Sequence, residues 1–268
     1  MNNIYTLNHT NIIEFILLKK RIELCEIINL FLKDYEIYDA LDHGLIGKAI
    51  QNNVIELNKI QLRDFAINKH GQIDGKPFGG EKGMIMMVEP LENALKSISP
   101  KKKHIVINFS PQGKQLNQNL AKKMLDYDEI TIVNGRYEGI DERFIDKYVD
   151  LEVSLGDYVF SNGDLASLVL IDVLARMIPS VIGKEESVTE DSFFNGLLKG
   201  PTYTRPEVYD GMSVPEILLS GNHEEIKAWR EYQSIKTTLE KRPEIFDKIK
   251  LTKKQKKLLE ELDSKRIL

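Results

Sequence analysis

Short runs rich in β-branched residues alternate with longer segments of helical periodicity as far as Pro179. The short runs predict strands at residues 25–30, 105–109 and 130–133, and the longer segments predict helices at residues 117–125 and 165–177. Alternation of this kind is typical of a mostly parallel sheet that carries helices on both faces. The sequence therefore predicts an α/β fold for this part of the chain.

The character of the chain changes after Pro179. Residues 183–191 are mostly polar, and the stretch that follows is punctuated by glycine and proline as far as Gly221. Apolar residues then recur at helical spacing over residues 223–235 and 252–262. We therefore expect four parts: an N-terminal extension of unknown role at 1–22, an α/β domain at 23–182, a linker at 183–195 and a small helical domain at 196–268.

The overall charge is too even to attract nucleic acid by itself. The 268 residues carry 37 Lys and Arg against 41 Asp and Glu, a formal net charge of -4, so any RNA binding depends on local patches. The basic runs at 101–103 and 253–257 are usual for a solvated face, but they could also supply phosphate contacts. Trp229 fits the core of a small helical domain better than a base-stacking role.

Composition excludes several classes of site. Cys25 is the single cysteine, which rules out an internal disulfide and a multi-cysteine zinc site and fits a reducing compartment. The five histidines lack metal-ligand spacing, so we predict no metal site. We expect no membrane span, because the most apolar long stretch, 165–179, is short and contains Asp172 and Arg176. Basic residues follow the apolar run at 12–18, the wrong order for a secretory signal, so we expect a cytoplasmic protein.

Three glycine-containing turns follow strand-like or apolar runs: SPQG at 110–113, GRYEG at 135–139 and LGDYVFSNG at 155–163. Ligands of open α/β sheets bind beyond the carboxyl ends of the strands, so the three turns could enclose a small molecule. Glycine allows close backbone approach, which suits recognition of an adenine edge by main-chain groups. Glycines also end strands in every α/β protein, so the turns could equally be structural. Neither GxGxxG nor GxxxxGK[ST] occurs, which argues against a dinucleotide fold and a P-loop.

Charged residues stand at two places where the sequence leaves two interpretations open. Asp172 and Arg176 are four residues apart on a largely apolar helix, so they could pair with each other. Alternatively the arginine fork points into a site, because a buried guanidinium needs a partner. Residues 187–190 have the S-x-x-E form of a helix-capping box, and Asp191 follows them. Asp191 is accordingly either part of a helix start or a catalytic carboxylate.

A series of motifs covers nearly the whole chain. They are PFGGEKGMIMMVEPL at 77–91, SPQGK at 110–114, GRYEGIDER at 135–143, SLGDYVFSNGDL at 154–165, RMIPSVIG at 176–183, ESVTEDSF at 186–193, YTRPEVYDGMSVPEILLSGNH at 203–223 and IKAWR at 226–230. In this order they resemble the bacterial tRNA (guanine-N1)-methyltransferase family of the knotted SPOUT superfamily. The resemblance implies a parallel sheet with a deep trefoil knot, a rare exception to the rule that chains do not thread their own loops, and a homodimer.

The resemblance assigns the three glycine turns to S-adenosylmethionine, the methyl donor. Carried over residue by residue, the cofactor contacts fall on Ser110, Pro111, Gly135, Glu138, Leu155, Gly156, Asp157, Tyr158, Val159, Phe160 and Gly163. The catalytic pair falls on Asp191 and Arg176, with the aspartate supplied by the opposite subunit. A Mg²⁺ requirement is left open by the resemblance, with Glu138 as the candidate participant.

The implied reaction gives both catalytic residues a role. The methyl group goes to N1 of the guanosine immediately 3′ of the tRNA anticodon, where a second guanosine precedes it. Since N1 carries a proton at neutral pH, a general base is needed, and Asp191 is the candidate. Negative charge then spreads toward O6, where the Arg176 guanidinium would stabilise it. The products are tRNA with N1-methylguanosine and S-adenosylhomocysteine.

Three residues depart from the family pattern. Glu81 and Asn162 stand where glycines are usual, and Lys199 replaces a usual aspartate. Two other functions therefore remain: a related SPOUT methyltransferase that acts at another RNA position, and a tRNA-binding protein without activity. The motif at 203–223 argues against the first, and the retained catalytic pair argues against the second.

Overall fold

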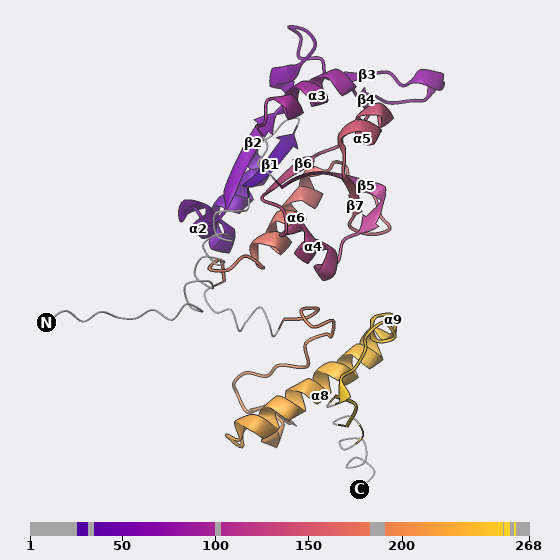
Figure 1. The fold of residues 1–268 in the computed structure, drawn as a ribbon. Coiled ribbons are helices and arrows are strands. Elements are labelled where there is room, and N and C mark those ends of the chain that lie inside the picture. The colour runs from indigo at the N-terminus through magenta and orange to yellow at the C-terminus, as the bar shows by residue number, and fades with distance from the viewer. Residues whose placement is uncertain are drawn as a thin grey trace, which may run out of the picture. The chain divides into compact units, whose positions relative to one another are not determined.

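The computed structural model describes residues 26–31, 35–99, 103–182, 191–253, 255–257 and 260 (Figure 1). The chain divides into two compact units, Met1–Glu185 and Glu186–Leu268, and each is described by itself. The extension expected at 1–22, the basic residues 101 and 102 and the capping box at 187–190 lie outside the described residues.

A five-stranded sheet forms the centre of the first unit, in the order β2-β1-β6-β5-β7. Its strands are β1 (Glu26–Phe31), β2 (Glu56–Gln61), β5 (His104–Gln115), β6 (Glu129–Val133) and β7 (Leu151–Ser154), and every neighbouring pair is parallel. All five residues of β6 are buried, as expected for a strand that is covered on both faces. The prediction of an α/β fold with a parallel sheet is confirmed.

The strand β5 is longer than the sequence predicts. The prediction ended it at Phe109, but β5 runs on to Gln115, with a register shift against β7 between Phe109 and Lys114. The SPQG turn is therefore a bulge inside this strand. Gly113 makes the bulge sterically possible, because a Cβ atom there would lie 2.4 Å from the backbone nitrogen of Val153.

Helices cover both faces of the sheet. The 3-10 helix η1 (Tyr35–Asp42) and the helices α2 (Gly44–Gln51), α4 (Gln118–Met124) and α6 (Asp164–Ala175) pack on one face, whereas α3 (Val88–Lys96) and α5 (Glu142–Tyr148) pack on the other. Alternate residues of β5 separate the two cores: Ile105 and Ile107 belong to the first and Val106 to the second. The helices predicted at 117–125 and 165–177 correspond to α4 and α6.

A two-stranded antiparallel ribbon follows β2 and the short 3-10 helix η2 (Leu62–Phe65). It pairs β3 (Asp74–Gly75) with β4 (Ile85–Met86), and the loop between them contains the 3-10 helix η3 (Phe78–Gly80). In Figure 1 this ribbon lies beside α5 and its loop extends outward. The motif PFGGEKG is thus an exposed loop, with 95% of the Phe78 side chain accessible to solvent.

The second unit is built around α8 (His223–Lys241), which runs beyond the predicted end at residue 235. Its other elements are the hairpin β8 (Val208–Tyr209) and β9 (Met212–Ser213), the 3-10 helix η4 (Glu216–Leu218) and α9 (Pro243–Phe246). Tyr232, Ile235 and Thr238 are buried along α8, and the Trp229 ring lies 6.4 Å from that of Tyr203. In the range 252–262, where a second helix was predicted, the described residues 253, 255–257 and 260 are helical. Among the helices of the described ranges, none is long and apolar enough to cross a membrane.

Candidate active site

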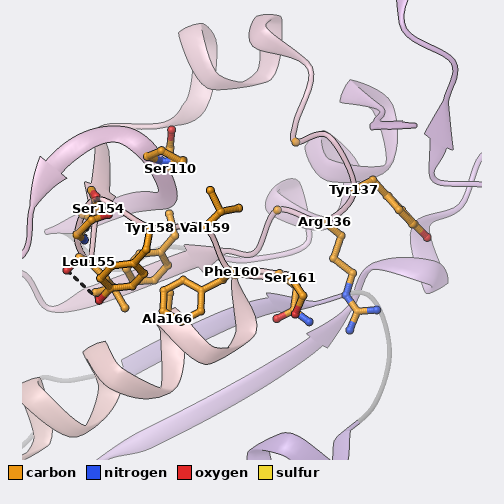
Figure 2. Close-up of a pocket in the computed structure, with 18 of the residues that line it drawn as sticks. Ser110, Arg136, Tyr137, Ser154, Leu155, Tyr158, Val159, Phe160, Ser161 and Ala166 are labelled. Atoms are coloured by element: carbon orange, nitrogen blue, oxygen red, sulfur yellow. Dashed lines mark hydrogen bonds between the residues drawn. The ribbon is translucent and has the colours of Figure 1, made fainter. Parts of the chain in front are cut away.

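The three glycine turns come together beside β5, β6 and β7 and enclose a cavity of about 290 Å³ (Figure 2). This volume is close to the lower end of the range for small-molecule sites. The strands β6, β5 and β7 are neighbours in a parallel sheet, so the bulge in β5 and the segments that follow β6 and β7 meet at one edge. The lining residues are Phe109, Ser110, Pro111, Gly135, Arg136, Tyr137, Glu138, Gly139, Val153, Ser154, Leu155, Gly156, Tyr158, Val159, Phe160, Ser161, Asn162, Gly163 and Ala166.

Nearly all of the cofactor contacts expected from the sequence lie in this one cavity. The structure brings together Ser110, Pro111, Gly135, Glu138, Leu155, Gly156, Tyr158, Val159, Phe160 and Gly163. Asp157 is the exception, since it is exposed and does not line the cavity. The segments that contribute these residues are far apart in the sequence, so the fold and not local sequence creates the site.

The LGDYVFSNG turn gives the cavity an apolar, aromatic wall. The rings of Tyr158 and Phe160 meet edge to face with centroids 5.4 Å apart, and the Tyr158 hydroxyl donates a hydrogen bond of 3.3 Å to the Leu155 carbonyl. Gly156 has φ 154°, and a Cβ atom there would lie 2.6 Å from the Tyr158 ring. Figure 2 shows Leu155, Tyr158 and Phe160 grouped on one side of the cavity. A flat apolar ligand can pack against this wall.

The GRYEG turn supplies the charged part of the lining. Glu138 is the one carboxylate among the cavity-lining residues and Arg136 is the one cation. Tyr137 has φ 58°, a backbone conformation that is costly for a tyrosine and is held by its surroundings. Two residues after this turn, Asp141 caps the N-terminus of α5 and accepts side-chain hydrogen bonds from Arg143. These bonds hold the pKa of the Asp141 carboxyl below its usual value.

Backbone hydrogen bonds join the ribbon β3–β4 to this charged turn. The Glu138 backbone nitrogen donates to the Met84 carbonyl at 3.0 Å, and the Met86 nitrogen donates to the Gly139 carbonyl at 3.0 Å. Gly83 lies directly against Glu138, because a Cβ atom there would be 2.4 Å from the Glu138 Cγ. The loop with the PFGGEKG motif is therefore next to the cavity, although it does not line it.

The departures from the family pattern are accommodated without a strained backbone. Glu81 has φ -63°, so this position does not need a glycine. Asn162 is not among the described residues with positive φ, and its Oδ1 accepts a 3.0 Å hydrogen bond from the Asp164 nitrogen at the start of α6. Lys199 is exposed, and its backbone nitrogen donates to the Ser192 Oγ at 2.9 Å.

The two expected catalytic residues lie outside the cavity lining and in different units. Arg176 is the C-cap of α6 in the first unit, and Asp191 is a half-buried residue of the second. The sequence interpretation that Arg176 is a buried guanidinium in need of a partner is wrong for the single chain, because both Arg176 and Asp172 are exposed. Since α6 begins at the cavity with Asp164 and has 12 residues, Arg176 is about 18 Å from that end.

Several residues of the cavity were not predicted from the sequence. Arg136, Tyr137 and Asn162 lie within quoted motifs, and their position between two predicted contacts is the signal that could have found them. Phe109, Val153 and Ala166 belong to strands or a helix, and only the fold places them at the cavity. In the described part of the chain, no group of three or more His, Cys, Asp or Glu side chains could hold a metal ion.

Comparison with known proteins agrees with the motifs. A family model described as tRNA (Guanine-1)-methyltransferase TrmD matches residues 24–248. A tRNA (guanine-N(1)-)-methyltransferase of Clostridium perfringens strain 13 is 44% identical over 232 residues, which cover 87% of this chain and 98% of the relative. Proteins of the same name from Clostridium botulinum strain Hall and Clostridium beijerinckii are each 43% identical over 230 residues, or 86% of this chain, and these cover 95% and 96% of the relatives.

Proposed function

Since this chain belongs to the tRNA (guanine-1)-methyltransferase family, it is an S-adenosylmethionine-dependent methyltransferase, and we propose that it methylates N1 of the guanosine immediately 3′ of the tRNA anticodon. The products are tRNA that carries N1-methylguanosine and S-adenosylhomocysteine. One observation carries the proposal: ten of the expected donor contacts, from three separate segments, line a single cavity.

The cavity suits S-adenosylmethionine in its chemistry. Leu155, Val159 and Phe160 supply apolar surface for a purine ring, and the glycine turns bring backbone groups close enough to recognise its polar edge. Glu138 places one negative charge in the lining, which complements a cationic ligand. When bound, S-adenosylmethionine supplies a methyl group on a positively charged sulfur. The residues of the cavity bind and orient it, and methyl transfer then depends mainly on positioning.

Asp191 and Arg176 act on the acceptor. The Asp191 carboxylate accepts the proton from guanine N1, which makes the nitrogen nucleophilic. The Arg176 guanidinium holds the negative charge that moves to O6 as the proton leaves. Both side chains are accessible to a substrate, since Arg176 is exposed and Asp191 is half-buried.

Two copies of the chain form the complete enzyme. Arg176 lies about 15 Å along α6 from Ala166, the residue of this helix that lines the cavity of its own chain. The first turns of the same helix expose the apolar side chains Leu165 and Val169, at 42% and 44%. A second copy that covers this surface and contributes Asp191 would place a carboxylate beside the donor cavity. The family resemblance supports the same homodimer, together with a trefoil knot in the segment that forms the three turns.

The remaining parts of the chain have separate roles. We assign residues 23–182 to the methyltransferase domain, 183–195 to a linker that carries Asp191, and 196–268 to a domain that binds tRNA. The family match begins at residue 24, so residues 1–22 take no part in this assignment. Glu138, the one carboxylate of the cavity lining, is the residue that would contact a Mg²⁺ ion, because Mg²⁺ commonly binds through one or two carboxylates and keeps several water ligands. No step is assigned to a metal.

The experiment uses labelled S-adenosylmethionine and unmodified tRNA transcripts that differ only in the base after the anticodon. Transfer that requires guanine at this base is the expected result. Transfer to another position would identify a related RNA methyltransferase, and tRNA binding without any transfer would identify a protein that has lost its activity. Either of these two results would overturn the proposed function.

A further inference from the structure

A buried chain of hydrogen bonds lies behind the cavity. The Tyr38 hydroxyl donates to the Asp164 Oδ1 at 2.8 Å and accepts from the Asn134 Nδ2 at 3.0 Å. All three residues are almost completely buried, at 0%, 1% and 1% exposure. None of them lines the cavity, and the residues come from η1, the end of β6 and the start of α6. A single hydroxyl therefore connects three elements that are far apart in the sequence.

Two further side chains extend this group. The Ser167 Oγ donates to the Asn134 Oδ1, and the Arg136 Nη2 donates to the Asp164 Oδ2 at 3.2 Å in an ion pair. Arg136 is the member that also lines the cavity. We call Tyr38, Asn134, Asp164, Ser167 and Arg136 the buried network. Because a buried carboxylate without partners would be strongly destabilising, each member depends on the others.

The buried network stands directly behind two of the glycine turns. Asn134 precedes Gly135, and Asp164 follows Gly163, and both glycines line the cavity. The Gly163 nitrogen donates to the Gly135 carbonyl at 3.0 Å. The turns touch so closely that a Cβ atom on Gly163 would lie 3.1 Å from the Asn134 Cα. A shift of either polar residue would therefore be transmitted to the cavity wall.

A purely structural network would stabilise the fold and leave ligand affinity unchanged. This one differs from an ordinary core contact in its location, because its members flank the two turns and it holds the guanidinium of a lining residue. Binding sites need their lining fixed within fractions of an ångström by the residues behind it. We propose that the buried network, with Tyr38 as its central hydroxyl, positions the GRYEG and LGDYVFSNG turns for the methyl donor. The inference rests on the proposed function, since it names residues that serve the same cavity.

The test compares two tyrosine hydroxyls in the same unit. Tyr38→Phe removes the hydroxyl of the buried network, and Tyr148→Phe removes a hydroxyl that donates to Glu92 away from the cavity. Affinity for S-adenosylhomocysteine is measured by calorimetry, and the melting temperature is measured in parallel. Tyr38→Phe should weaken binding about tenfold, the effect of one lost hydrogen bond, while the control binds normally. Equal affinity in Tyr38→Phe and in the unaltered protein would overturn the proposal.

A second pair of measurements covers the case in which Tyr38→Phe does not fold. Asp164→Asn keeps the side-chain shape but removes the charge that holds Arg136, so it should also weaken binding. Hydrogen exchange on the unaltered protein should show that S-adenosylhomocysteine protects η1, although η1 does not line the cavity. Protection confined to the lining segments would contradict the inference. Failure of the proposed function is distinguishable, because it appears in the tRNA assay of the unaltered protein.

Discussion

The donor cavity and the acceptor pair are constructed in different ways. The cavity lies within the first unit, where neighbouring strands of one sheet carry its turns. The acceptor pair is divided, since Arg176 closes α6 in the first unit and Asp191 belongs to the second. Under the proposed function, binding of the donor is a property of one folded unit, whereas transfer depends on assembly of two copies. Substitutions should separate the two properties.

Asp191→Asn should reduce turnover by about a thousandfold or more, because it removes the general base but keeps the size of the side chain. Affinity for S-adenosylhomocysteine should stay within about twofold, since Asp191 is proposed to act on the guanine and not on the donor. Single-turnover kinetics and calorimetry measure the two quantities. The matched control is Asp247→Asn, an exposed aspartate of the same unit. Unchanged turnover in Asp191→Asn would remove Asp191 from the mechanism.

Arg176→Ala should lower the rate of methyl transfer about a hundredfold, because the charge on O6 loses its guanidinium. Arg176→Lys should recover only part of the rate, since an ammonium group cannot reproduce the planar fork. The measurement is kcat with saturating tRNA, and donor affinity should again be unaffected. A large loss of S-adenosylhomocysteine binding in Arg176→Ala would contradict the proposal that Arg176 acts on the guanine and not on the methyl donor.

Gly113→Ala should lower the affinity for the methyl donor, whereas the substitutions of Asp191 and Arg176 lower the rate of transfer. The added Cβ would lie 2.4 Å from the Val153 nitrogen, so the bulge must move. Overpacking of this kind costs about 1–3 kcal/mol of unfolding free energy. We expect affinity for S-adenosylhomocysteine to fall about tenfold by calorimetry. Gly75→Ala is the control, because its Cβ would meet nothing closer than 3.8 Å and Gly75 does not line the cavity. Equal affinities for the two variants would show that the bulge does not shape the site.

The smallest effect is expected for His104, which begins β5 at the end of the sheet away from the cavity. Partial burial lowers the pKa of His104 below 6.5, with the charge of Asp150 acting in the opposite direction. Neutral His104 is thus favoured in the folded state. Its contribution to stability is complete above pH 6.5 and declines as the pH falls toward the folded-state pKa. NMR should show that His104 titrates with a pKa below 6.5. In His104→Gln, the free energy of unfolding should fall less as the pH is lowered, and donor affinity should not change. Titration above 6.5 would contradict this.

The sequence predicted the elements that carry a strong local pattern. β6 is rich in β-branched residues, and α6 has a long, mostly apolar sequence, so both were found close to their true bounds. The edge strand β2, with the sequence ELNKIQ, was missed because polar residues interrupt its pattern. The continuation of β5 beyond Phe109 was missed because SPQG is typical of a turn, and only pairing with β7 reveals a bulge.

Most of the cavity-lining residues named from the sequence could be found from ordered motifs, but the geometry of the cavity could not. The positive φ of Tyr137, and the 3.0 Å hydrogen bond that the neighbouring Glu138 nitrogen donates to the Met84 carbonyl, depend on the tertiary fold. The buried network was not predicted at all, because Tyr38 lies almost a hundred residues before Asn134 and no local pattern links them. Exposure of Arg176 was also missed, since an arginine on an apolar helix can face either the core or a partner.

One measurement tests directly whether the two halves of the site come from different copies. A chain with Gly163→Val, folded but defective in donor binding, is expressed together with a chain that carries Asp191→Asn, and only mixed dimers are purified by two affinity tags. These mixed dimers should retain about half of the normal methyl transfer, since one cavity and one aspartate remain intact on opposite chains. Mixed dimers as inactive as either parent dimer would contradict the proposed division of the site between two copies.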